Sequence, residues 1–348
     1  MKSHFCMTAA LCAALTLASC AGAVPDGPVP EARPLRLVVR ALGDGESRAT
    51  DIVSNDEATE AKVNGLQVLV FDGESLDGYG SSAGSRIATV SCTAGTREIW
   101  AVVNAPDLSS VKTRSELLSS VSSLEEDISN FRMTGSRTET LSGDSEVRIP
   151  VDRLAARVVL RGVRNDHTNA SRFRLVSVCL TNATGDVDYG RSATYEVSRW
   201  YNRRGYESDN SLGSFTYDAV GADIARGDTY STAHFFYSMP NAYPAKAGVG
   251  EGETGFTPRA ARLVVRCEID GTLYNYPITL PALESNRSYE IELLSITRNG
   301  NPDDGRHDPD DPDDRDEEDP VTGLGLGFEV VVNPWSVVLL GDDGDMQI

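Results

Sequence analysis

The sequence predicts an all-β protein with two β-sandwich domains and one short helix in the first of them. Three observations support this fold class. Apolar residues alternate with polar ones in many short stretches, as they do on strands that bury one face. Helical spacing of apolar residues is confined to one segment. The dipeptide Asp270-Gly271 separates two alternating stretches, which is a specific signal for a β-hairpin.

The length and charge of the chain limit what it can be. The chain has 348 residues and a formal net charge of −20, and 40% of its residues are hydrophobic. This length suffices for two domains with separate cores. Nucleic acid is excluded as a partner, because phosphates require a basic surface and this chain is strongly acidic.

Residues 1–20 have the features of a lipoprotein signal peptide. Lys2 precedes an apolar run from Phe5 to Leu17, which is too short to span a membrane. The run ends in Leu-Ala-Ser-Cys, the pattern of a bacterial lipobox, so we expect Cys20 to carry a lipid. The alternative is an ordinary signal peptide in which Cys20 is incidental.

A short strand and a polar loop follow the signal peptide. Residues 21–34 are rich in Pro and Gly and are expected to form a flexible spacer. Leu35–Leu42 is expected to be a strand, with Leu35, Leu37, Val39 and Ala41 on its apolar face. The next stretch, residues 43–51, is polar and contains Arg48, and exposed loops of this kind are preferred sites of proteolysis.

The first domain is placed at residues 49–151. We expect strands at residues 62–71, 86–93 and 98–104, a loop at residues 73–85, and further alternation from Val147 to Val151. Thr113 and Glu116 form a capping box, and the apolar residues that follow at helical spacing predict one amphipathic helix ending near Ile128. Met133-Thr134-Gly135 is assigned to the loop after this helix.

The second domain is placed at residues 152–300. We expect one strand or a pair of strands at residues 152–163, and single strands at residues 171–181 and 287–298. Residues 262–269 and 272–280 are expected to form a hairpin, in which Pro277 moves part of the second strand toward a sheet edge. In the second of these strands, Phe173, Leu175, Ser177 and Cys179 are expected to share one face. Residues 182–258 form a long irregular stretch with a short strand at His234–Met239. Trp200-Tyr201 within it belongs either to the core, which we favour, or to a binding surface.

Three cysteines remain after the signal peptide and the lipid site are set aside. Cys92, Cys179 and Cys267 are odd in number and widely spaced, which predicts buried free thiols rather than a disulfide framework or a zinc site. The motifs of hydrolases, metalloproteases and phosphate-binding loops do not occur, and the four histidines are isolated in sequence. We therefore predict a protein that is not an enzyme and that binds no metal and no cofactor.

An acidic tether, residues 301–322, leads to the C-terminal segment, residues 323–348. The tether has eleven acidic residues between Asp303 and Asp319, but Pro309 and Pro312 interrupt the spacing of a calcium loop, so a self-repelling linker is favoured over a calcium site. After the tether, apolar residues at a period of two predict one strand with a single apolar face: Leu324, Leu326, Phe328, Val330 and Val332. A tethered strand suits a groove that need not belong to the same molecule.

In their order along the chain, these features resemble the Bacteroidales fimbrillins, the subunits of type V pili. The stretches that carry the resemblance are Val70-Phe71-Asp72, residues 100–105 (WAVVNA), residues 131–135 (FRMTG), residues 151–158 (VDRLAARV), residues 286–289 (NRSY) and residues 330–335 (VVVNPW). Each stretch is short, and the specificity comes from their order. Residues 182–258 depart most from the pattern of the family.

The resemblance implies two transthyretin-like sandwiches and a mechanism of assembly. It implies that the lipid on Cys20 brings the precursor to the outer membrane, and that an arginine-specific protease cuts between Arg48 and Ala49. Residues 21–48, with the strand Leu35–Leu42, would then leave a groove. The C-terminal donor strand of another fimbrial subunit would fill this groove through main-chain hydrogen bonds and alternate side chains, which gives a head-to-tail fimbria that supports surface adhesion.

Two other functions remain open from the sequence. The chain could be the anchor or the tip of the same fimbria, because an anchor keeps its lipid and a tip needs no donor strand. It could also be a surface lipoprotein that binds glycans through aromatic residues near Trp200.

Overall fold

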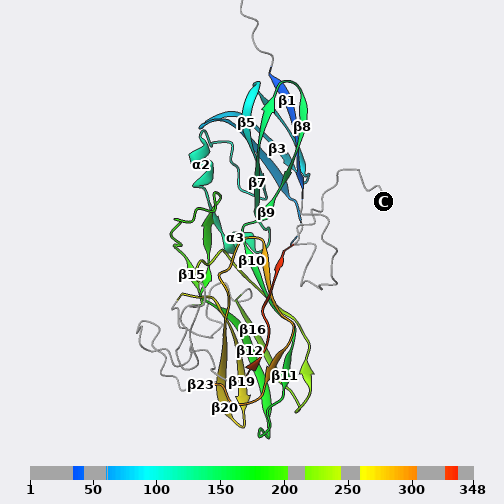
Figure 1. Ribbon diagram of the computed structural model, residues 1–348, viewed down its shortest axis with the longest axis vertical. Helices are drawn as coiled ribbons and strands as arrows, with labels where there is room; N and C mark the ends of the chain where they lie inside the picture. The colour runs from blue at the N-terminus through cyan, green and yellow to red at the C-terminus, as the bar shows by residue number, and fades with distance from the viewer. Residues whose placement is uncertain are drawn as a thin grey trace, which may run out of the picture. The chain divides into compact units, whose positions relative to one another are not determined.

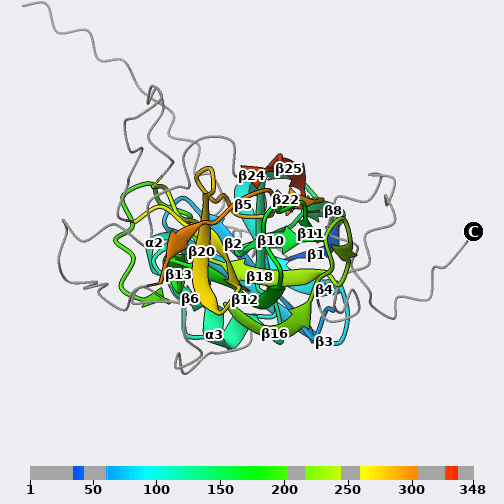
Figure 2. The ribbon, with the colours of Figure 1, turned by 90° about the horizontal axis from the view of Figure 1, so that it is seen from below.

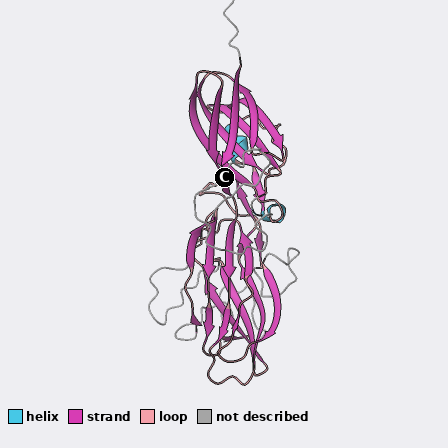
Figure 3. Cartoon of the chain, turned by 90° about the vertical axis from the view of Figure 1, so that its right-hand side faces the viewer, coloured by secondary structure: helices cyan, strands magenta, loops and turns pink. Residues whose placement is uncertain are grey.

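The computed structural model describes residues 34–42, 60, 62–202, 216–243, 259–303 and 326–335. In these ranges the chain is nearly all β, with two short helices, as Figure 3 shows. The all-β fold class predicted from the sequence is confirmed. Two groups of sheets enclose separate hydrophobic cores, and Figure 1 shows the strands that build each group.

In the first sandwich, a sheet of three strands faces a sheet of five. The three-stranded sheet has the order β4-β1-β8, and the five-stranded sheet has the order β3-β2-β5-β7-β9. Their bounds are β1 Leu35–Leu42, β2 Gly65–Asp72, β3 Ser75–Ala83, β4 Ile87–Cys92, β5 Gly95–Val103, β7 Met133–Leu141, β8 Ser145–Pro150 and β9 Asp152–Arg153. Leu66, Val68 and Val70 of β2 point into the core between the sheets, whereas Leu69 and Phe71 belong to a second cluster on the other side. Burial on both faces explains why β2 is a nearly continuous apolar run.

Two strands of this sandwich differ from the sequence expectation. Residues 75–83 form β3 rather than a loop, and Met133-Thr134-Gly135 begins β7 rather than lying in a loop. Both segments are rich in small and polar residues, so their sequences show no apolar alternation. Glycine is nevertheless required at one position in each strand. A Cβ added at Gly78 would lie 2.4 Å from the carbonyl oxygen of Ser91, and one at Gly135 would lie 1.9 Å from that of Pro150. Glycine permits these backbone contacts.

The predicted single helix is two helices with a strand between them. The capping box at Thr113 is present and starts α2 (Arg114–Leu118), but α2 ends after five residues. The hydroxyl of Ser119 donates to the carbonyl of Ser115 at 2.7 Å, which satisfies the end of the helix. β6 (Val121–Ser123) then pairs with β14 (Asp186–Asp188), and α3 (Leu124–Asp127) follows. Pairing with a distant segment therefore overrides the helical period, and Val121 is left 49% exposed.

In the second sandwich, a five-stranded sheet faces two sheets of four strands. The orders are β16-β12-β19-β20-β23, β18-β10-β21-β25 and β17-β11-β22-β24. The bounds are β10 Ala156–Leu160, β11 Val163–Asn165, β12 Phe173–Thr181, β16 Tyr217–Asp223, β17 Thr229–Tyr230, β18 His234–Ser238, β19 Arg262–Ile269, β20 Thr272–Thr279, β21 Arg287–Ile291, β22 Leu294–Ile296, β23 Asn301–Pro302, β24 Leu326–Gly327 and β25 Val331–Pro334. The predicted strand 287–298 is thus interrupted between β21 and β22, where Leu293 is 38% exposed instead of buried.

The sequence predicted the β19–β20 hairpin correctly but assigned the faces of β12 wrongly. β19 and β20 pair as predicted around Asp270 and Gly271, whose φ angles of 50° and 86° fit a two-residue turn. In β12 the register shifts between Leu175 and Ser177. This bulge places Phe173, Leu175 and Val178 in the core, so Ser177 and Cys179 do not share the face of Phe173.

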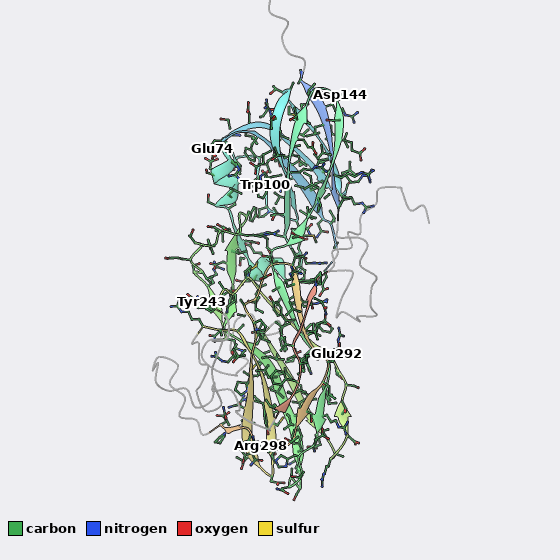
Figure 4. All side chains as sticks on the ribbon, in the orientation of Figure 1. Glu74, Trp100, Asp144, Tyr243, Glu292 and Arg298 are labelled. Atoms are coloured by element: carbon green, nitrogen blue, oxygen red, sulfur yellow. The ribbon has the colours of Figure 1, made fainter. Side chains whose placement is uncertain are left out.

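The long stretch 182–258 contains several short strands in its described part. Besides β14, β16, β17 and β18, these are β13 (Ala183–Thr184) and β15 (Trp200–Tyr201), which pair with each other. The strand predicted at His234–Met239 is present as β18. Tyr201 packs against the core of the second sandwich and against the cluster that contains Leu69 and Phe71, as favoured from the sequence. Trp200 instead contacts Tyr243, labelled in Figure 4, with ring centroids 6.0 Å apart.

The three cysteines are free and buried, as predicted. Burial raises the pKa of the Cys179 thiol to about 12 and also raises the pKa of Cys92 and Cys267. These thiols are therefore protonated packing groups.

Candidate functional site

The first candidate site is the slot that β1 occupies. β1 is the central strand of its sheet, antiparallel to β4 and parallel to β8. Leu37, Val39 and Ala41 are 0% exposed and point into the core of the first sandwich. The predicted strand and its apolar face are confirmed here. Because β1 separates β4 from β8, its removal would leave two unpaired strand edges and an open apolar core.

The outward face of β1 mixes polar and apolar side chains, and none of them is fully buried. Arg36 is exposed, and its backbone N–H donates to Asp144 (labelled in Figure 4) at 2.9 Å. Arg40 lies 3.5 Å from Glu146 of β8, a surface pair that contributes little stability. The hold on β1 therefore comes from its main-chain pairing and its three buried side chains.

The second candidate site is the C-terminal segment, residues 326–335. β24 pairs with β22, and β25 pairs with β21, so this segment runs along the second sandwich of its own chain (Figures 1 and 2). The sequence predicted one continuous strand. The structure corrects this, because the strand is interrupted at residues 328–330, next to the break between β21 and β22. Glu292, labelled in Figure 4, lies at that break.

The apolar residues of this segment do not share one buried face. Leu326 and Val330 pack partly against the core of the second sandwich. Phe328 and Val332 are 42% and 45% exposed, and Val331, which was expected on the opposite face, is 37% exposed. The break changes the direction of the side chains. As a result the segment is an exposed edge with few buried contacts along its length.

The end of the segment is held much more firmly, at Trp335. The ring of Trp335 is 2% exposed and packs edge-on against Phe131 at 5.3 Å between centroids. The guanidinium carbons of Arg153 and Arg157 lie 4.4 Å and 5.1 Å from the centroid of the same ring. The indole N–H donates to a carboxylate oxygen of Glu60 at 3.2 Å. We call Glu60, Arg153, Arg157, Tyr237 and Trp335 the Trp335 cluster.

Burial sets the electrostatics of this cluster. Glu60 accepts from Arg157 at 2.9 Å and from the hydroxyl of Tyr237 at 2.6 Å. Burial lowers the pKa of Arg153 to about 10 and raises that of Tyr237. At neutral pH Arg153 is therefore still charged. Glu60 binds both arginines, Arg157 through its carboxylate and Arg153 through its backbone carbonyl.

Sequence reasoning did not assign a role to Glu60, Arg153, Arg157 or Tyr237. A signal was present in residues 152–160 (DRLAARVVL), where two arginines stand four residues apart in a strongly apolar run. Arginines in such a run require buried partners. Their partners are Glu60 and Trp335, which lie 93 and 182 residues from Arg153 in sequence. The pairing could therefore not be predicted from the sequence.

The other predicted site residues lie outside the described residues. These are Cys20, Arg48, Ala49 and Leu324, together with all but the first three residues of the acidic tether. Within the described ranges, no group of three or more His, Cys, Asp or Glu side chains is arranged to hold a metal ion. In the same ranges, no helix is both long and apolar enough to cross a membrane.

Comparisons with known proteins match this architecture. Residues 34–150 match the model of the family described as "Major fimbrial subunit protein (FimA)". No curated protein matches the chain. The family match indicates a structural protein rather than an enzyme, as the sequence predicted.

Solved structures share the fold over most of the chain. A candidate cell adhesion protein from Parabacteroides distasonis is 20% identical with a TM-score of 0.61, covering 89% of this chain and 99% of that one. A fimbrilin from Porphyromonas gingivalis is 19% identical with a TM-score of 0.59, covering 88% and 98%. A candidate cell adhesion protein from Bacteroides eggerthii is 18% identical with a TM-score of 0.60, covering 87% and 96%. At these identities the likeness shows the fold, and the sequence resemblance rests on residues 34–150.

Proposed function

Since the chain resembles the Bacteroidales fimbrillins, in sequence over residues 34–150 and in fold over most of its length, we propose that it is a structural subunit of a cell-surface fimbria. In this proposal it polymerises head to tail by exchange of strands between subunits. Its sandwiches, at residues 49–151 and 152–300, form the body of the subunit.

The observation that carries the proposal is the position of β1. β1 lies between β4 and β8, and residues 43–64 separate it from β2, so no tight turn joins it to another strand of its sheet. Such a strand can leave without breaking any other connection in the sheet.

Cleavage after Arg48 is the step that we propose frees β1. An arginine-specific protease would cut between Arg48 and Ala49 and detach the propeptide from a precursor lipidated at Cys20 in the outer membrane. The burial of Leu37 and Val39 implies a hydrophobic slot, and each comparable side chain that refills it contributes about 1.5–3 kcal/mol.

The replacement strand in the proposal is the C-terminal segment of another subunit. Leu324, Leu326, Phe328, Val330 and Val332 would enter the slot, and main-chain hydrogen bonds to β4 and β8 would supply the rest of the affinity. The exposure of Phe328 and Val332 in the single chain supports this role, because little buried apolar area is lost when these side chains leave their own subunit.

The proposal is tested by Arg48→Ala in cells that assemble the fimbria. We expect full-length lipoprotein to accumulate at the outer membrane and to be missing from sheared fimbriae. Arg36→Ala is the matched control, because Arg36 is an exposed arginine of the same propeptide. Fimbriae that incorporate the Arg48→Ala chain normally would refute the proposal.

Deleting residues 323–348 separates a shaft subunit from a tip subunit. A shaft subunit that lacks its donor segment should cap the fibre and shorten it. A tip subunit should be incorporated as before, with fibres of normal length.

A further inference from the structure

The Trp335 cluster joins four distant parts of the chain at one point. Glu60 precedes β2, Arg153 and Arg157 belong to β9 and β10, Tyr237 belongs to β18, and Trp335 directly follows β25. Glu60, Arg153, Arg157 and Trp335 are each no more than 4% exposed. A cluster of this kind can therefore fix the C-terminal segment to the body of its own subunit.

Trp335 is attached through its backbone as well as its ring. Its N–H donates to the carbonyl of Asn286 at 2.9 Å, and its carbonyl accepts from Nη1 of Arg153 at 3.1 Å. Arg153 in turn donates from Nη2 to the backbone carbonyl of Glu60 at 2.9 Å. The same arginine thus bridges the segment before β2 and the end of the C-terminal segment.

Glu60 supplies the carboxylate that lies nearest to the guanidinium of Arg157. Arg157 contacts Glu60 at 2.9 Å and Glu290 at 3.6 Å. Glu290 is closer to Arg161, at 2.8 Å, so its charge is already shared. Without the carboxylate of Glu60, the buried guanidinium of Arg157 would keep only its longer ion pair with Glu290, which Arg161 already shares, and breaking a buried pair in this way is strongly unfavourable.

The rest of the C-terminal segment is held weakly by comparison. β24 contributes two paired residues and β25 four, and three of the apolar side chains between Leu326 and Val332 are more than a third exposed. The stability of the segment on its own subunit therefore depends on the attachment at Trp335.

We propose that Glu60 is a positioning residue that controls the release of the C-terminal segment. Its carboxylate holds Arg157 and the indole of Trp335 in place, and this keeps β24 and β25 docked on their own sandwich. Glu60 follows Arg48 in the sequence, so it stays in the chain after the proposed cleavage. Loss of β1 alone would then leave the C-terminal segment docked.

Hydrogen–deuterium exchange on the full chain tests the role of Glu60 independently of fimbria assembly. The variant is Glu60→Gln, which keeps the shape of the side chain and removes its charge. We expect exchange in a peptide covering residues 326–335 to rise at least about tenfold, whereas exchange in a β1 peptide, residues 35–42, stays unchanged. Glu292→Gln is the control, because the side chain of Glu292 is 70% exposed and pairs with Arg161 outside the cluster.

Two results would overturn the inference. One is unchanged exchange of residues 326–335 in Glu60→Gln. The other is an equal rise in both peptides, which would mean general destabilisation. If Glu60→Gln does not fold, Trp335→Phe decides in its place, since it removes the indole N–H bond and keeps an aromatic ring. It should raise exchange in residues 326–335 selectively, and no selective rise would refute the role of the bond to Glu60.

A second measurement asks whether the attachment limits assembly, which rests on the proposed function. After cleavage of the purified chain by an arginine-specific protease, Glu60→Gln should polymerise at least several times faster than the wild type. An equal or lower rate would show that the Trp335 cluster does not limit release. If the wild type does not polymerise, the proposed assembly fails, while the exchange experiment still decides the role of Glu60.

Discussion

Leu37→Ala should weaken the docking of β1, because Leu37 is one of the buried side chains that hold this strand in its sheet. Leu37 is 0% exposed and lies opposite Val90 of β4 and Ser145 of β8. A buried Leu→Ala substitution costs about 2–5 kcal/mol through lost transfer energy and the cavity left behind. Taking about 3 kcal/mol, the ratio of docked to undocked β1 falls about 100-fold, because each 1.4 kcal/mol is a factor of ten.

Urea-induced unfolding of the full chain measures this cost, with Arg36→Ala as the control on the same strand. Arg36 is exposed, and its one described bond to Asp144 is made by the backbone, so its removal should change the unfolding free energy by less than about 0.5 kcal/mol. If Leu37→Ala and Arg36→Ala cost the same within that margin, β1 does not plug an apolar slot and the reasoning fails.

Three further predictions concern the body of the subunit. Gly135→Ala should lower the unfolding free energy by about 1–3 kcal/mol in urea titrations, because the new Cβ would meet the carbonyl of Pro150. Gly143→Ala, which meets nothing within 4 Å, should leave it nearly unchanged. Burial raises the pKa of Asp127 from 3.8 to about 7, so the stability that this group contributes is complete below pH 3.8 and is lost as the pH rises through 7. Relative to Asp127→Asn, the wild type should lose about 2 kcal/mol of unfolding free energy between pH 5 and 8, and a constant difference would contradict the assignment. Finally, Cys179 and Cys267 should react with a thiol reagent at neutral pH only after denaturation, because both are fully buried and their pKa values are raised, and rapid labelling of the native chain would contradict this packing.

Local patterns in the sequence predicted those elements that are marked by residues close to one another in sequence. β1 and β2 follow from alternation and apolar content, and the β19–β20 hairpin follows from Asp270-Gly271. The helix start at Thr113 follows from its capping box. In each of these elements the residues that define the structure lie within a few positions of one another.

The errors arise where distant segments decide the local structure. Residues 75–83 look like a loop because they are rich in Gly and Ser, yet pairing with β2 and close contact with β4 make them a strand. Pairing with β14 ends the predicted helix at β6. The bulge in β12 reverses which side chains face the core after Leu175, and no residue type in the sequence indicates this bulge.

The candidate site was predicted in part. The strand β1 and its buried face followed from the alternation of Leu37, Val39 and Ala41, and the slot was implied by the family resemblance. The interruption of the C-terminal strand and the Trp335 cluster were not predicted. Glu60 has no apolar period around it that would mark it as buried, and its partners come from three other parts of the chain. Long-range charge pairing of this kind is visible only once the fold is known.

The N-terminal sequence of the chain isolated from fimbriae tests the central claim most directly. Processing at Arg48 and loss of β1 predict a mature chain that begins at Ala49. A chain in the fimbria that begins at Cys20 and keeps its lipid would contradict the account, because β1 would still fill the slot between β4 and β8.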